Sequence, residues 1–344
     1  MTTAGDEITV RVPGRVNLIG DHTDYTGGLA LPMAIDRWTT LTGRRGGTRV
    51  QLSSTVEAGT VDLSLPSATD PAVTMPAWGR FVAGVVAELQ PEVGLSGRID
   101  STIPVGAGLS SSAALGVAVA LALGFEGSAL ELAALCQRAE HRATGVPTGI
   151  MDQWCIASAR SGHATLLDCH SFEQTHVPIP DDAQIAVVFV AHRTLDGSPY
   201  ADRVAQCAAA EALIGPLRLA RADDVERLDE PLLRRRARHV VTENQRVREF
   251  ADALRAGDLV TAGQVMRASH TSLRDDYEVS TPQVDQVVNH LNALPGVYGA
   301  RLTGGGFGGC VVAMCRPGVE LPGAWWVRPV DAAGHSASPE DPPT

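Results

Sequence analysis

The chain has 344 residues with 28 cationic and 39 anionic side chains, so its formal net charge is −11. Every cation is arginine, because the sequence contains no lysine. This excludes mechanisms that need a lysine amine: the P-loop, the protein-kinase catalytic set, and Schiff-base or pyridoxal-phosphate chemistry. The negative balance also argues against binding to nucleic acid, whose phosphates it repels.

Composition places the chain among soluble globular proteins, with 44% hydrophobic and 19% charged residues. At about 150 residues per domain, its length predicts two domains. The N-terminus lacks the basic and apolar regions of a signal peptide, and no apolar run of about 18 residues appears. The six cysteines form no regular pattern. We therefore expect a cytoplasmic monomer with reduced thiols and no membrane partner.

Residues 1–180 read as a mixture of strands and helices. Short β-rich segments bounded by Gly, Pro or Asp predict strands at Ile8–Val12, Leu29–Ile35, Thr48–Ser53, Thr60–Leu65, Gly97–Ile103, His163–Cys169 and Gln174–Ile179. Helical spacing of apolar residues predicts helices at Trp78–Leu89, Ser110–Leu123 and Ser128–Thr144.

Residues 181–330 are richer in helix. Strands are predicted at Ile185–Val190, Val297–Leu302, Cys310–Cys315 and Trp325–Val330, with helices near 200–214, 231–255, 258–274 and 283–294. Residues 331–344, rich in Pro, Ser and acid, are predicted to be a disordered tail. The pattern therefore predicts an α+β protein with domains at 1–180 and 181–330.

The strongest local signal is Pro104–Ala113, which lies between a predicted strand and a predicted helix. Gly106 and Gly108 allow the backbone to turn its N–H groups inward, and Ser110, Ser111 and Ser112 open the helix. Such a loop can hold an anion without any lysine. The simpler interpretation is a turn with a serine cap, but three serines exceed what capping needs. We interpret the loop as a phosphate site.

A second polar cluster lies in Pro13–Gly28. Arg15, Asp21, His22 and Asp24 share what looks like one turn-rich loop, as recognition of a polyhydroxylated ligand requires. A solvated turn is the structural alternative. A metal site is disfavoured because one histidine and two aspartates offer too few ligands.

Two further segments carry glycine or an isolated acid. Residues 304–309 hold five glycines in six positions, which indicates either a tight hairpin or a backbone that approaches a ligand closely. Asp152 stands among Gly, Ile, Met and Trp, where partial desolvation would suit a base, although a capping or surface role is the simpler reading. Together the clusters indicate an enzyme that handles a nucleotide or a phosphate.

With these motifs in order, the chain resembles the galactokinases of the GHMP kinase superfamily. The three superfamily motifs correspond to Pro13–Gly28, Pro104–Ala113 and Leu302–Cys310. Gly20–Tyr25 and Gly149–Gln153 resemble galactokinase elements specifically. So do Arg236–Asn244 and Ser272–Ser280, and the match runs from about residue 8 to 330.

The resemblance implies a two-domain GHMP kinase-like fold, with a mixed-sheet N-terminal domain, an α/β C-terminal domain and the active site between them. It implies transfer of phosphate from ATP, with Mg²⁺, to the anomeric hydroxyl of galactose. Carried over by position, Asp152 is the base and Arg15 the charge-stabilising cation. The other implied roles are sugar contacts (Asp21, His22, Asp24, Gly149, Tyr200), the phosphate loop (Gly106, Ala107, Gly108, Leu109, Ser110, Ser111, Ser112) and Mg²⁺ ligands (Ser112, Glu140).

Two departures from the family pattern bear on the sugar. Galactokinases usually have Glu at the position of Asp21, and residues 191–199, before Tyr200, are unlike the usual version. Two alternatives therefore stay open. One is a sugar 1-kinase for N-acetylgalactosamine, arabinose or a uronic acid. The other is a catalytically silent regulator that binds sugar and ATP, against which the intact set of Arg15, Glu140 and Asp152 argues.

Overall fold

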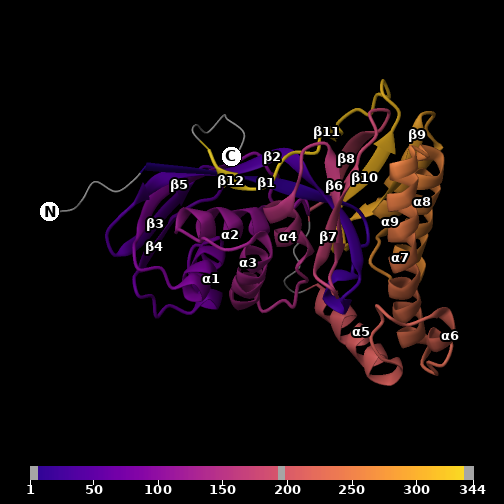
Figure 1. Ribbon diagram of the computed structural model, residues 1–344, viewed down its shortest axis with the longest axis horizontal. Helices are drawn as coiled ribbons and strands as arrows, with labels where there is room; N and C mark the ends of the chain where they lie inside the picture. The colour runs from indigo at the N-terminus through magenta and orange to yellow at the C-terminus, as the bar shows by residue number, and fades with distance from the viewer. Residues whose placement is uncertain (1–6, 193–197, 337–344) are drawn as a thin grey trace.

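Two β-sheets organise the chain in the computed structural model, which describes residues 7–192 and 198–336 (Figure 1). The first sheet has eight strands and the second has four. The α+β class predicted from the sequence is confirmed. Among the described helices, none is both long enough and apolar enough to cross a membrane.

The first sheet is built mainly from the N-terminal half of the chain. Its path runs β12-β1-β2-β5-β3-β4, and β6 pairs with both β2 and β7. All of its pairings are antiparallel except that of β3 with β5. The strands are β1 (Glu7–Ile19), β2 (Leu29–Arg45), β3 (Arg49–Ser54), β4 (Thr60–Ser64), β5 (Leu95–Ser101), β6 (His163–Asp168), β7 (Glu173–Pro178) and β12 (Gly334–His335).

Helices α1 (Gly79–Leu89), α2 (Ser111–Ala122), α3 (Ala129–Thr144) and α4 (Met151–Ser158) cover one face of this sheet (Figure 1). Helix α2 is apolar almost throughout and is buried between the sheet and the other helices. Gly84 permits a close approach of α1 to α3, since a Cβ there would lie 2.3 Å from the carbonyl oxygen of Ala139. The short helices η1 (Asp24–Thr26) and η2 (Pro71–Val73) lie in connections.

The second sheet is antiparallel, in the order β11-β8-β10-β9. Its strands are β8 (Gln184–Ala191), β9 (Val297–Thr303), β10 (Gly309–Cys315) and β11 (Trp325–Val327). Helices α7, α8 and α9 stand beside it, and α5 and α6 lie at the far end of α7 (Figure 1). Their bounds are α5 (Tyr200–Ile214), α6 (Ala222–Val225), α7 (Pro231–Ala256), α8 (Leu259–Asp275) and α9 (Pro282–Ala293). Gly263 of α8 lies against the Tyr298 carbonyl of β9, where no side chain would fit.

The structure differs from the sequence-based expectation at β1. The segment Pro13–Ile19 is strand, and not part of a loop, so Arg15 projects from a sheet. The pairing with β2 shifts register between Pro13 and Gly14, which accommodates a proline in the strand. Gly14 passes close to the phosphate loop, because a Cβ there would lie 2.9 Å from the Leu109 carbonyl oxygen. The Arg15 N–H donates to that carbonyl.

The C-terminus also differs from expectation. The predicted disordered tail began at residue 331, but β12 pairs with β1, with Val10 opposite His335. The Ala333 N–H donates to the Ile156 carbonyl, and the Ser336 N–H to the Thr9 carbonyl. The tail prediction is therefore wrong for residues 331–336, and residues 337–344 lie outside the described part of the chain. The predicted boundary at residue 180 falls between β7 of the first sheet and β8 of the second.

Candidate active site

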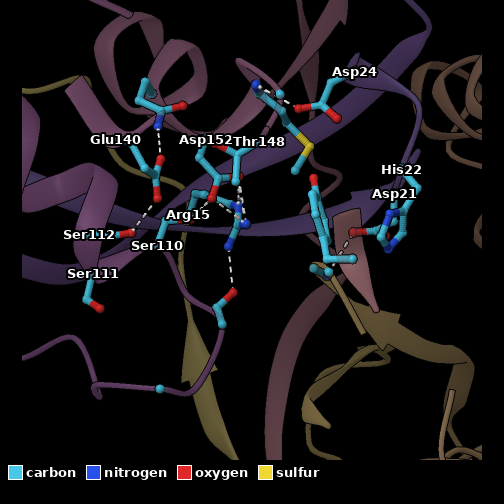
Figure 2. Close-up of a pocket in the computed structure, with 18 residues that line it drawn as sticks. Arg15, Asp21, His22, Asp24, Ser110, Ser111, Ser112, Glu140, Thr148 and Asp152 are labelled. Atoms are coloured by element: carbon cyan, nitrogen blue, oxygen red, sulfur yellow. Dashed lines mark hydrogen bonds and ion pairs between the residues drawn. The ribbon is translucent and has the colours of Figure 1, made fainter. Parts of the chain in front are cut away.

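A cavity of about 160 Å³ lies where the two sheets meet (Figure 2). Its walls come from β1 and the turn after it, the phosphate loop, α3, α4, the start of α5 and the glycine loop before β10. Of the predicted site residues, Ala107 and Leu109 do not line it, because their side chains are buried in the core. The lining residues are Arg15, Asp21, His22, Asp24, Gly106, Gly108, Ser110, Ser111, Ser112, Glu140, Thr148, Gly149, Met151, Asp152, Gln153, Tyr200, Gly304 and Gly305.

Arg15 and Asp152 form a two-pronged ion pair at the cavity wall. The Arg15 Nε donates to Asp152 Oδ1 at 2.8 Å and Nη2 donates to Oδ2 at 2.7 Å. The third guanidinium nitrogen, Nη1, donates to the Gly108 carbonyl at 2.6 Å. The Arg15 side chain is 4% exposed, whereas that of Asp152 is 28% exposed. The carboxylate is thus held in a fixed direction but remains accessible from the cavity.

The phosphate loop approaches the same carboxylate. Gly106 and Gly108 have left-handed backbone angles, with φ of 74° and 79°, and Ser110 shares this conformation at φ 63°. Such an angle is uncommon outside glycine and marks a constrained position. It directs the Ser110 hydroxyl away from capping α2 and toward Asp152, to which it donates. The first turn of α2 then begins at Ser111, beside the cavity.

Glu140 of α3 lies beside Ser112, as its predicted role requires. The Ser112 hydroxyl donates to Glu140 Oε1 at 3.1 Å, and the Gln153 amide donates to Oε2 at 2.6 Å. Burial, together with the nearby charge of Asp152, raises the pKa of Glu140 to about 7. A carboxylate with its pKa raised in this way would be stabilised in its ionised form by a bound cation.

Asp24 and Gly149 are in direct contact across the cavity. Asp24 Oδ2 accepts a hydrogen bond from the Met151 N–H at 3.1 Å, at the start of α4. A Cβ on Gly149 would lie 1.8 Å from this oxygen, so only glycine fits. Burial raises the pKa of Asp24 to about 6. Asp24 therefore ties the turn after β1 to α4.

Asp21 is engaged by the protein itself. Its Oδ2 lies 2.5 Å from Arg301 Nη2, and its Oδ1 accepts from the Gly304 N–H at 2.7 Å. Asp21 is 1% exposed and Arg301 is 0% exposed. Burial raises the pKa of Asp21, although the guanidinium opposes this. The carboxylate thus joins the turn after β1 to the glycine loop.

The remaining predicted sugar residues lie together. The His22 ring is 5.2 Å from the ring of Tyr200, measured between centroids, and both line the cavity. Tyr200 begins α5, and its side chain is buried. Residues 193–197, part of the atypical stretch before Tyr200, lie outside the described residues.

A second cavity, of about 400 Å³, adjoins the phosphate loop from the other side. It is largely apolar, and Ser111 and Ser112 line both cavities. Sequence reasoning missed it because its walls come from separate elements. Trp78 and Phe81 lie at the start of α1, Val56 lies in the β3–β4 connection, and Leu115 lies on α2. Thr148 and Gln153 were also given no role, and a lone threonine or glutamine carries no signal of its own.

Comparison with known proteins agrees with this geometry. Models of the galactokinase galactose-binding signature, the GHMP kinases N terminal domain and the GHMP kinases C terminal match residues 2–45, 80–160 and 250–321. Human galactokinase is 42% identical over 334 residues, which cover 90% of this chain and 84% of that protein. The chain belongs to the galactokinase family. Galactokinase from Roseiflexus sp. is 44% identical over 337 residues, with 91% and 85% covered.

Solved structures place this galactokinase-family kinase in the same fold. The structure of Lactococcus lactis galactokinase complexed with galactose superposes with a TM-score of 0.87, at 30% identity and with 95% of each chain covered. Mevalonate kinase from Methanococcus jannaschii, at 20% identity and a TM-score of 0.67, shares the fold. The resemblance and the fold inferred from the sequence are both confirmed.

Proposed function

We propose that this kinase transfers the γ-phosphoryl group of ATP to the anomeric hydroxyl of galactose, giving galactose 1-phosphate. The observation that carries the proposal is the Arg15–Asp152 pair, which stands in the cavity wall next to the phosphate loop. The sugar hydroxyl then meets a fixed carboxylate on one side and a phosphate-binding backbone on the other. Membership of the galactokinase family supports galactose as the sugar.

Asp152 accepts the proton of the sugar hydroxyl in this scheme. Its accessible face points to the cavity, while the two-pronged ion pair with Arg15 holds its orientation. Arg15 also lies near enough to the loop, through its bond to the Gly108 carbonyl, to stabilise charge on the transferring phosphoryl group. Phosphoryl transfer demands mainly positioning and charge stabilisation, which this rigid pair supplies.

The sugar and the nucleotide occupy adjacent spaces in the proposal. His22, Asp24, Gly149 and Tyr200 contact the sugar in the smaller cavity. The adenosine part of ATP occupies the larger apolar cavity, and its phosphates reach the sugar across Ser111 and Ser112, which both cavities share. Asp21 shapes the sugar site through Arg301 and Gly304.

Ser112 and Glu140 fit a magnesium ion. Mg²⁺ is usually bound by one or two carboxylates together with substrate phosphates, and Glu140 is a carboxylate in the cavity lining beside the Ser112 hydroxyl. No group of three or more His, Cys, Asp or Glu that could hold a metal occurs among the described residues, so the protein alone would not complete a metal shell. When bound, Mg²⁺ would neutralise charge on the ATP phosphates.

The test is ATP consumption with a panel of hexoses and pentoses, including galactose, N-acetylgalactosamine, arabinose and a uronic acid. Wild type should turn over galactose best, and Asp152→Asn should lower kcat by about 10²- to 10⁴-fold with ATP binding intact. Asp62→Asn, which removes an exposed carboxylate paired with Arg49, is the matched control. Absence of turnover on every sugar would overturn the kinase proposal, and preference for another sugar would overturn galactose.

A further inference from the structure

Three of the chain's four tyrosines gather around His22. The centroid of the His22 ring lies 5.9 Å from that of Tyr25, 5.2 Å from Tyr200 and 4.9 Å from Tyr277. These side chains come from the turn after β1, the start of α5 and the connection between α8 and α9. His22, which lines the sugar cavity and is labelled in Figure 2, thus has three aromatic rings close to its own.

A continuous line of hydrogen bonds leads away from His22 into the protein. His22 Nδ1 lies 2.9 Å from the Tyr25 hydroxyl, which lies 2.6 Å from the Tyr277 hydroxyl. The Tyr277 hydroxyl in turn lies 3.0 Å from Cys207 Sγ, on α5. Tyr277 is 0% exposed and Cys207 is 1% exposed. Neither the thiol nor this tyrosine hydroxyl has a role in the chemistry described above.

The backbone that carries Tyr277 is also held in place. Arg203 Nε donates to the Tyr277 carbonyl at 2.7 Å, and the ring of His239 lies 4.4 Å from the Tyr277 ring. Arg236, buried beneath the same connection, donates to the carbonyl of Asp276 and to the carboxylate of Glu278. The line of hydrogen bonds is therefore anchored in a rigid part of the protein at Tyr277, so it can hold the His22 side chain at its other end.

The chemistry of the groups sets the direction of the line. A neutral imidazole nitrogen is a better acceptor than a phenol oxygen, and a phenol O–H is a good donor, so the strongest arrangement has Tyr25 donating to Nδ1. The Tyr25 oxygen then accepts from Tyr277, whose oxygen accepts from the Cys207 thiol. Burial raises the pKa of Tyr25 and of Tyr277 well above the usual value, which keeps both hydroxyls protonated.

We propose that the line Cys207–Tyr277–Tyr25 fixes the orientation of the His22 ring and its Nε2–H tautomer, and thereby the way in which His22 meets the sugar at the cavity wall. Tyr25, Tyr277 and Cys207 are positioning residues, because they act on the sugar only through His22. This inference rests on the proposed sugar site. It adds that recognition of the sugar at His22 depends on two tyrosine hydroxyl groups and a thiol behind it.

Kinetics give the first test. Tyr25→Phe removes the donor to Nδ1 and should raise KM for galactose about five- to thirtyfold, the usual effect of losing a hydrogen bond to a buried group, while KM for ATP stays unchanged. Tyr277→Phe should have a smaller effect, and Cys207→Ala the smallest. The control is Tyr298→Phe, at the fourth tyrosine, which lies on β9 outside the cluster. Equal rises in both KM values, or no graded order, would overturn the proposal.

Nuclear magnetic resonance gives a second test that does not depend on turnover. In protein labelled with ¹⁵N-histidine, the two ring nitrogens of His22 report its tautomer, and His22→Asn identifies the signal among the ten histidines. Wild type should show the Nε2–H form, and Tyr25→Phe should show a mixture of tautomers. The Nδ1–H form in wild type would overturn the proposal even if galactose is phosphorylated. The Nε2–H form without galactose turnover would overturn the proposed function alone.

Discussion

The buried Arg301 offers a quantitative test of what holds the turn after β1, which carries Asp21, in place. Its Nη2 lies 2.5 Å from Asp21 Oδ2 and 3.8 Å from Glu243 Oε1, and its Nη1 donates to the Leu18 carbonyl at 3.0 Å. All three charged side chains are at most 1% exposed. Arg301→Met keeps a long apolar side chain but removes the charge, so it leaves Asp21 buried without its cation.

The size of the effect follows from burial. Removing one partner of a buried ion pair costs about 3–5 kcal/mol, and the lost bond to the Leu18 carbonyl adds about 1 kcal/mol. Glu243 keeps a cation, since its Oε2 lies 2.7 Å from Arg246 Nε. The pKa of Glu243, which burial would raise, is lowered to about 2 by neighbours led by Arg246. We therefore expect Asp21 to account for most of the loss.

The loss should depend on pH, with a sign that the structure fixes. Burial already raises the pKa of Asp21, and without Arg301 it should rise further. The folded variant then binds a proton that the unfolded chain has released above a pH of about 3.9, so stability falls as pH rises. Each pH unit contributes about 1.4 kcal/mol, so the deficit at pH 8 should exceed that at pH 5 by up to about 4 kcal/mol.

Urea unfolding of wild type, Arg301→Met and Arg301→Met/Asp21→Asn at pH 5 and pH 8 measures these quantities. The double variant should be more stable than the single variant at pH 8, because the uncompensated carboxylate is gone, and its deficit should vary little with pH. A single-variant deficit below about 1 kcal/mol, or one equal at both pH values, would refute the reasoning, since a buried unpaired charge must cost more than an exposed one.

Two further predictions concern the site. The Mg²⁺ concentration for half-maximal turnover should rise about tenfold per pH unit below pH 7, because Glu140, with its pKa of about 7, takes up a proton there. Glu140→Gln should weaken Mg²⁺ binding and abolish this pH dependence, whereas Glu320→Gln, at an exposed site, should change neither. An unchanged Mg²⁺ requirement in Glu140→Gln would exclude Glu140 as a ligand. Gly149→Ala should raise KM for galactose at least about tenfold, because its Cβ would lie 1.8 Å from Asp24 Oδ2. Gly116→Ala, whose Cβ has only ordinary contacts, is the control, and steady-state kinetics on both variants would show whether Asp24 is needed for sugar.

Features set by local sequence were predictable. The phosphate loop and its helix were expected at Pro104–Ala113 and Ser110–Leu123, and α2 runs over Ser111–Ala122. Glycine can take the left-handed angles that this tight loop needs, and serine is favoured at a helix N-terminus, so the signal lies within ten residues. The resemblance to galactokinases, which the comparisons confirm, rests on several such local signals read in order.

Features set by distant contacts were not predictable from local sequence. Arg15 and Asp152 are 137 residues apart, and only the resemblance suggested that they meet. The ion pair of Arg301 with Asp21 could not be recognised in the local sequence, since an arginine before a glycine run looks like a surface residue. Strand β12 is two residues long and pairs with β1, more than 300 positions away in the chain, so a composition rich in Pro, Ser and acid concealed it.

The geometry of the site explains how a kinase can bind ATP without any lysine. In the cavity lining, Arg15 is the sole side chain with a permanent positive charge among the described residues, and Asp152 already neutralises it. In the proposal, the charge of ATP is balanced by backbone N–H groups, by the dipole at the start of α2, by a metal ion and by arginine, with Arg15 in this cavity and Arg80 in the wall of the larger one. None of these requires an amine. A chain that lost every lysine could keep this chemistry, because none of the positive charge in the proposed mechanism comes from a lysine side chain.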